Sequence, residues 1–138
     1  MIVFDENIHQ ESLLEAVAHW YPGKVLSVTE LRPGTFIPDE EIPTLLRRAK
    51  GATFVTTNAA DFWRKIPAHA RYCVICFPLP NERVEEVPEL LRRLLRLPEF
   101  RTKAARLGKV IRASSEEIRY YRAGDPTVHS LPWPESPT

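Results

Sequence analysis

The sequence predicts an α/β domain in which helices cover both faces of a central, mainly parallel sheet. Short apolar runs that fit buried strands alternate with segments carrying apolar residues at helical spacing. The 138 residues match one ordinary domain, and 43% apolar with 27% charged residues fits a globular protein with a core. Strands that alternate with helices favour a parallel sheet, where ligands bind beyond the carboxyl ends of the strands.

The first 50 residues predict two strands and two helices. Residues 2–4 and 25–28 are apolar and fit short strands, and residues 9–20 have helical spacing. A second helix is expected over residues 39–50. Because a proline is tolerated only in the first turn, this helix is expected to begin near Pro43, after a turn.

The remaining chain predicts further strands and helices, followed by a tail. Gly124 is expected to close a domain of residues 1–124, and the proline-rich segment 125–138 has little patterning and predicts an extended or disordered tail. The expected elements are strands at 52–56, 72–77, 109–113 and 118–121, a short helix or turn at 59–65, and a helix at 84–97. The segment 118–121 is also compatible with a helix.

The two cysteines and the apolar runs limit the possible classes of protein. Cys73 and Cys76 form a single C-x-x-C pair inside an apolar run, and residues three apart on a strand point to opposite faces. We therefore expect buried thiols rather than a zinc or disulfide site. Because no apolar run reaches the roughly 20 residues of a membrane helix, we expect a cytoplasmic protein without a membrane association.

Charge is unevenly distributed along the chain. Residues 1–46 hold eight acids and two basic residues, whereas residues 92–122 hold ten basic residues and three acids. This asymmetry suggests a polar ligand handled by both halves, and the basic stretch could neutralise an RNA backbone. A solvated helix face explains the basic residues equally well. The candidate RNA-binding residues are Arg92, Arg93, Arg96, Arg101 and Lys103.

Acidic and amide side chains follow the predicted strands. Asp5 comes directly after the first strand, Asn58 and Asp61 follow the third, and Asp39 opens the helix before it. Right-handed crossovers can bring these positions to one edge of the sheet. Close carboxylates repel one another unless a cation lies between them, and hard oxygen ligands select Mg²⁺ or Mn²⁺. The pattern thus predicts a site for metal-dependent phosphodiester chemistry.

Each of these residues also has a structural interpretation. Asp39 and Asp61 could cap helices, and Asn58 is a common turn residue. A receiver-like signalling domain would also place acids after its first strand. Such a domain usually has a lysine after its last core strand, whereas Pro78-Leu79-Pro80 stands there in this sequence.

Three short segments follow one another along the chain. They are Phe4-Asp-Glu-Asn7, then Asp39-Glu-Glu-Ile42 with Ala49 and Gly51-Ala52, and then Val55-Thr-Thr-Asn58 with Asp61-Phe62. In this order they resemble the PIN-like family of metal-dependent ribonucleases. The resemblance covers roughly residues 1–80. It is strongest to the compact branch found in bacterial toxin–antitoxin gene pairs.

The resemblance implies a three-layer α/β/α fold and an endoribonuclease that uses Mg²⁺ or Mn²⁺. Asp5, Asp39 and Asp61 would be the metal ligands, and Thr57 and Asn58 would orient them by hydrogen bonds. The partners implied are an RNA substrate and an antitoxin protein that holds the enzyme inactive, and many members form homodimers.

The sequence departs from the family pattern in one respect that concerns catalysis. Larger members carry a further acid on helices between the first strand and the D-x-x-I run, and no recognisable motif supplies it here. Glu6 or Glu41 could provide the missing charge, with Glu11, Glu15 and Glu30 as further candidates. A PIN-like module that binds a protein or nucleic acid without catalysis is therefore the alternative function.

Overall fold

The structure, a computed structural model, describes residues 1–8, 10–49 and 51–134. Within them, seven strands form one sheet in the order β2-β1-β3-β4-β5-β6-β7. The strands are β1 (Ile2–Phe4), β2 (Val25–Ser27), β3 (Ala52–Thr56), β4 (Tyr72–Cys76), β5 (Lys109–Ala113), β6 (Glu117–Arg122) and β7 (Asp125–Pro132). Neighbours from β2 to β5 pair in parallel, and β6 and β7 add an antiparallel edge. The predicted α/β class with a mainly parallel sheet is confirmed.

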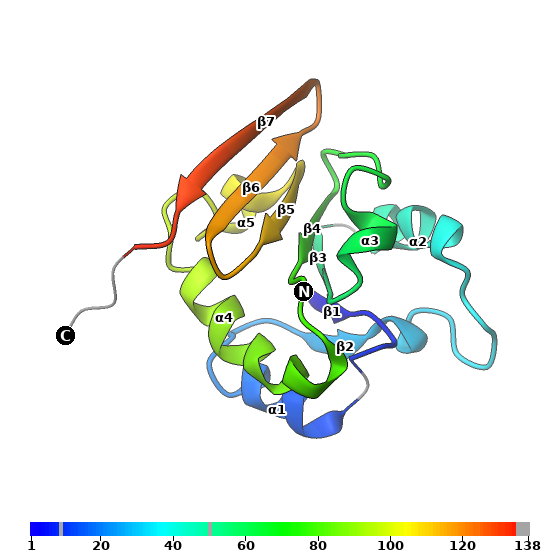
Figure 1. Cartoon of the computed structure of the whole chain (residues 1–138). Coiled ribbons are helices and arrows are strands. Elements are labelled where there is room, and N and C mark those ends of the chain that lie inside the picture. The colour runs from blue at the N-terminus through cyan, green and yellow to red at the C-terminus, as the bar shows by residue number, and fades with distance from the viewer. Residues whose placement is uncertain (9, 50, 135–138) are drawn as a thin grey trace.

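Helices pack on both faces of this sheet (Figure 1). Residues of α1 and α4 share a core with one face, and residues of α2 and α3 share a second core with the other. The α-helices are α1 (Glu11–Ala18), α2 (Ile42–Arg48), α3 (Ala59–Phe62), α4 (Val87–Leu94) and α5 (Lys103–Arg106). The 3₁₀ turns are η1 (Val28–Glu30), η2 (Asp39–Glu41) and η3 (Asn81–Glu86).

The start of α2 follows from its proline. Pro43 lies in the first helical turn, where its missing N–H removes no hydrogen bond from the helix. The preceding acids form the short turn η2, as predicted. This arrangement leaves Asp39 in a turn and exposed to solvent rather than inside a regular helix.

Two sequence predictions about the second half of the chain need correction. The helix expected over residues 84–97 is shorter, because a 3₁₀ turn precedes it and Pro88 lies in its first turn. Residues 125–132 are not a tail but the strand β7, which pairs antiparallel with β6. Prolines are tolerated in β7 because it is an edge strand, and one side of an edge strand needs no ladder hydrogen bonds. Residues 135–138 of the predicted tail lie outside the described residues.

The two cysteines lie on opposite faces of β4, as predicted. Cys73 belongs to the core under α1 and α4, and Cys76 belongs to the core under α2 and α3. Both thiols are unpaired and buried, and burial raises the pKa of each to about 12. They are therefore packing residues. In the part of the chain that the structure describes, no helix has the length and apolar character needed to cross a membrane.

The packing of Trp133 after β7 provides a test of this edge of the sheet. Its indole N–H donates to the Ser114 carbonyl at 2.6 Å, and the Arg93 guanidinium lies 4.9 Å from its ring. We expect Trp133→Ala to lower the free energy of unfolding by about 2 kcal/mol. Phe36→Ala is the control, since Phe36 is 74% exposed. Urea unfolding measures both, and equal small losses would contradict the docking of this segment.

Candidate functional site

The carboxyl ends of β1 and β3 meet at the point where the strand order reverses. The chain places β2 on one side of β1 and β3 on the other. Phe4 pairs with both Ser27 and Val55, and the Asp5 N–H extends the ladder by donating to the Val55 carbonyl at 2.9 Å. Ligands of open parallel sheets bind at such a switch point, so Asp5 occupies the position that the topology favours for chemistry.

Asp5 is held by two hydrogen bonds. The Thr56 hydroxyl donates to Oδ2 at 2.7 Å, and the Glu6 N–H donates to Oδ1 at 2.8 Å. Thr56 accepts in turn from the Asn58 N–H at 3.0 Å. Asp5 is only 6% exposed, and burial raises the pKa of its carboxyl even though both hydrogen bonds act in the opposite direction. The protein thus fixes an acid where its charge is disfavoured.

Asn58 and Asp61 lie directly after β3. The Asn58 amide donates to the Asp61 carboxylate at 2.6 Å, and Asp61 lies on the single helical turn α3. Thr57 is used differently, because its hydroxyl accepts from the Asn7 amide at 3.1 Å. The structure therefore places Asn58 against one of the predicted acids and places Thr57 against the loop after β1.

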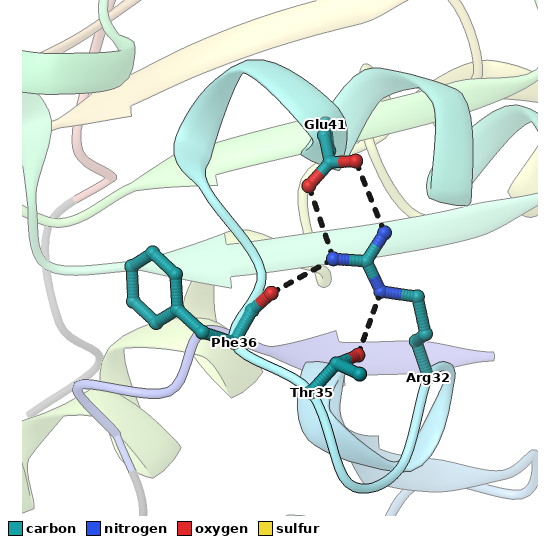
Figure 2. A network of polar contacts seen from close by, with 4 residues as sticks. All are labelled: Arg32, Thr35, Phe36 and Glu41. Atoms are coloured by element: carbon teal, nitrogen blue, oxygen red, sulfur yellow. Dashed lines mark hydrogen bonds and ion pairs between the residues drawn. The ribbon is translucent and has the colours of Figure 1, made fainter.

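Arg32 is the centre of a polar network in the loop that leads to η2 (Figure 2). The guanidinium donates to both carboxylate oxygens of Glu41, at 3.1 and 3.0 Å, and to the Phe36 carbonyl at 2.8 Å and the Thr35 hydroxyl at 3.0 Å. A fork-shaped Arg–carboxylate pair fixes geometry as well as charge. These contacts close the loop before Asp39 and fasten it to η2. Both carboxylate oxygens of Glu41, one of the candidates for the missing acid, are engaged in this pair.

The three predicted acids influence one another electrostatically. Partial burial raises the pKa of Asp39, and repulsion by Asp61 and then by Glu40 raises it further. After burial, repulsion by Asp39 and Glu6 also contributes to the raised pKa of Asp5. Within the described residues, none of the three acids is in an ion pair. Negative charge therefore gathers at this edge without a direct ion pair to balance it.

The oxygen donors at this edge fit a hard divalent cation. In the structure, however, the three carboxylates do not converge on one point. Carboxylate oxygens from three segments are available, together with the amide of Asn58. Among the residues that the structure describes, no three His, Cys, Asp or Glu side chains are arranged closely enough to hold a metal ion. A bound cation would have to draw the exposed Asp39 and Asp61 side chains together with Asp5.

A cleft of about 530 Å³ lies beside these acids, lined by Asp39 and Asp61 and by the basic residues Arg47 and Lys65. Thr44 and Arg47 also line a neighbouring pocket of about 360 Å³. Three further basic or titratable side chains line that pocket: Arg48, His69 and Arg71. The acidic edge therefore continues directly into a basic surface.

The basic residues predicted to bind RNA lie elsewhere. Arg92, Arg96, Arg101 and Lys103 line one pocket near the amino ends of the strands, together with Trp20, Tyr21 and Pro22, which precede β2. Arg93 lies against Trp133 instead. The structure therefore does not bring these candidates to the acidic edge.

Sequence reasoning missed the residues that support the site. Thr56 holds Asp5, but a threonine as the last residue of a strand looks like any β-branched strand residue. Arg47, Arg48 and Arg71 join only through the fold, since α2 and the segment before β4 are distant in the chain. The sequence could have indicated a basic helix end only for α2. Arg47 and Arg48 follow its buried residues Leu45 and Leu46 directly.

Comparison with known proteins adds no family assignment. No protein-family model matches the chain, and neither the curated proteins nor the solved structures contain a significant match. The residues and their geometry therefore carry the functional argument alone.

The raised pKa of Asp39 predicts that replacing this residue by neutral Asn increases the free energy of unfolding, and that the increase depends on pH. The folded protein holds this proton more tightly than the unfolded chain, whose group has the ordinary value of 3.8. Above the folded pKa the ionised group therefore costs stability, and below 3.8 the cost vanishes. In EDTA, Asp39→Asn should raise the free energy of unfolding by roughly 0.5 kcal/mol near pH 7 and by nothing near pH 3.

The exposed carboxylate of Glu85 provides the matched control for this experiment. Glu85→Gln removes the same charge from a residue that does not contribute to the raised pKa of Asp5 or Asp39, and it should leave stability unchanged at both pH values. A loss of stability in Asp39→Asn near neutral pH would show that the acids do not repel one another.

Proposed function

We propose that this protein is a PIN-like, metal-dependent endoribonuclease, with its active site at the carboxyl ends of β1 and β3. One observation carries the proposal: Asp5 is buried at the sheet's switch point, and electrostatic repulsion links it to Asp39 and links Asp39 to Asp61, although the three acids come from distant segments. Arg47 and Lys65 line the same cleft as Asp39 and Asp61, but within the described residues none of the three acids is in an ion pair. Neighbouring carboxylates without an ion pair support a site that takes its cation from solution.

Asp5, Asp39 and Asp61 would hold Mg²⁺ or Mn²⁺. When bound, such an ion supplies an activated water molecule and neutralises charge on the phosphate. Thr56 keeps the Asp5 carboxylate in place through its 2.7 Å hydrogen bond, and Asn58 orients Asp61. Glu6 and Glu40 add negative charge beside Asp5 and Asp39, so they could stand in for the further acid of larger family members.

The basic surface beside the acids supports a substrate with a phosphate backbone. An RNA strand crossing the acidic cleft would meet Arg47 at the shared wall and then Arg48 and Arg71 in the adjoining pocket. These side chains can neutralise the phosphates on one side of the scissile bond. Cationic side chains next to the acids favour a phosphate-containing substrate over a small neutral ligand. The predicted contacts of Arg92, Arg93, Arg96, Arg101 and Lys103 with RNA would need a strand that extends beyond this edge.

The resemblance extends the proposal to the biological setting. A compact PIN-like ribonuclease of this kind would act in the cytoplasm as the toxin-like member of a gene pair. An antitoxin protein would hold it inactive, and it could form a homodimer.

A catalytically incomplete binding module is the second candidate. It is favoured by the spacing of the acids, since no ready-made group of three ligands exists within the described part of the chain. Such a module would keep the basic surface and bind RNA or a protein without cleaving it.

Manganese binding separates the two candidates. At a metal concentration 100 times Kd, a specific site should raise the free energy of unfolding by about 2.7 kcal/mol. We expect this gain, and cleavage of a mixed RNA substrate, in the native protein. Asp5→Asn, Asp39→Asn and Asp61→Asn should each lose the gain and lower the cleavage rate at least about 100-fold.

Glu85→Gln is again the control and should keep both the stabilisation and the cleavage. Stabilisation of the native protein without cleavage would assign the metal to a binding module. If manganese changed neither property, or if the three asparagine variants behaved like the native protein, the nuclease proposal would be wrong.

The basic surface gives a separate prediction about RNA binding in EDTA. We expect Arg47→Gln and Arg71→Gln each to weaken binding of single-stranded RNA and to reduce the salt dependence of log Kd by about 0.7. Arg122→Gln is the matched control, because Arg122 is exposed on β6 and pairs with Asp125. Fluorescence anisotropy over a salt series measures the slopes. Equal slopes for the three variants would exclude this path for the RNA.

A further inference from the structure

A second pocket, of about 630 Å³, lies at the opposite edge of the sheet from the acids. It is formed by the segment that precedes β2, the end of α4, and α5 with the segment before it. Five cationic side chains line it: Arg92, Arg96, Arg101, Lys103 and Arg106. Among the residues that the structure describes, none of these five is in an ion pair. A cavity so strongly positive is suited to an anion.

Arg106 is the most informative of these residues because its side chain is buried. It is only 4% exposed, and its guanidinium donates to the Thr53 hydroxyl at 3.2 Å and to the Phe100 and Arg101 carbonyls at 3.0 Å each. All three acceptors are neutral. Buried charges are normally paired, since desolvation of an unbalanced charge is costly. The wall of this pocket therefore holds a fixed positive charge with no described counter-ion.

The neighbouring groups strengthen the same field. Lys103 lies across Gly51, so close that a Cβ on that glycine would collide with the lysine side chain. Burial lowers the pKa of the Met1 amino group, and repulsion by Lys103 and Arg106 lowers it further. Arg106 is thus held in place by the fold, and the exposed side chains of Arg92, Arg96, Arg101 and Lys103 surround it at the mouth of the pocket.

Aromatic side chains form another wall of the pocket. Trp20 and Tyr21 are both half-buried, and their rings meet edge to face with centroids 6.2 Å apart. Leu95 adds apolar surface between these rings and the arginines. Planar π-surfaces beside a positively charged groove are the combination that binds a base together with its phosphate.

The geometry points to a nucleotide-binding pocket at the amino edge of the sheet: we propose that it holds a nucleoside phosphate, with the phosphate among Arg96, Arg101 and Arg106 and the base against Trp20. The pocket is separate from the acidic edge, because the five residues of β3 span about 16 Å between them. Binding here therefore requires neither the metal nor the carboxylates of the proposed nuclease. The ligand is either a free nucleotide or the phosphorylated end of an RNA strand.

Calorimetric titration of the full chain with adenosine monophosphate in EDTA tests this pocket. Without divalent metal, binding is measured apart from any cleavage. We expect the nucleotide to bind at least about 10-fold more tightly than either adenosine or inorganic phosphate, and more weakly as salt is added. Arg96→Gln and Arg101→Gln should each weaken it about 10-fold. Trp20→Leu should weaken binding of the nucleotide but not binding of inorganic phosphate.

Controls and a second probe complete the experiment. Arg122→Gln removes the same charge from an exposed position on β6 and should bind normally, and Asp39→Asn should also bind normally. An oligoadenylate of about eight nucleotides, with and without a 5′-phosphate, identifies the source. Equal affinity for the mononucleotide and the phosphorylated strand supports a free nucleotide, and tighter binding of that strand supports an RNA end.

Two results would contradict the proposal that this pocket binds a nucleotide. One is the absence of nucleotide and oligonucleotide binding at millimolar concentration. The other is binding that Arg96→Gln and Arg101→Gln leave intact. Neither result bears on the nuclease proposal, which depends on the opposite edge of the sheet.

Discussion

Parallel pairing of β1 between β2 and β3 is the constraint on which the proposed chemistry depends. It aligns Phe4 with Val55 and so brings Asp5 beside Thr56 at a common strand end. A shift of one residue in this register would turn the apolar side chains of β1 away from their cores. The buried faces of the sheet therefore fix the position of Asp5, and the hydrogen bond from Thr56 only refines it. Stability and site geometry share one cause at this edge.

Much of the fold follows from the sequence, because burial leaves a simple pattern. Five consecutive buried residues in β3 read as a strand, and Pro43 marks the first turn of α2. For residues 125–132 this pattern was absent, and the prediction of a tail was wrong. Their prolines and polar residues conceal an edge strand, since one side of such a strand needs no hydrogen bonds and its faces are only partly buried. Pairing with β6 is a tertiary effect that local composition does not encode.

The candidate site divides in the same way. Asp5, Asp39 and Asp61 could be selected because each stands beside the end of a predicted strand or at the start of a predicted helix. Arg47 and Arg71 could not, since they become neighbours only when α2 packs beside the segment that precedes β4. The basic stretch 92–122 is dense in sequence but divided in space. Its density in sequence suggested one RNA surface, but α4 and α5 direct several of its arginines to the other edge of the sheet.

The resulting charge distribution has a physical consequence. Asp5, Asp39 and Asp61 lie near the carboxyl ends of the strands and the five cations of the second pocket lie near the amino ends, although the formal net charge is only +1. A polyanion approaching from solution is attracted to the basic pockets and repelled from the acids until a cation neutralises them. Occupation of the acidic edge by a divalent ion would therefore do more than supply chemistry. It would remove the electrostatic barrier that keeps a phosphate backbone away from Asp5, Asp39 and Asp61.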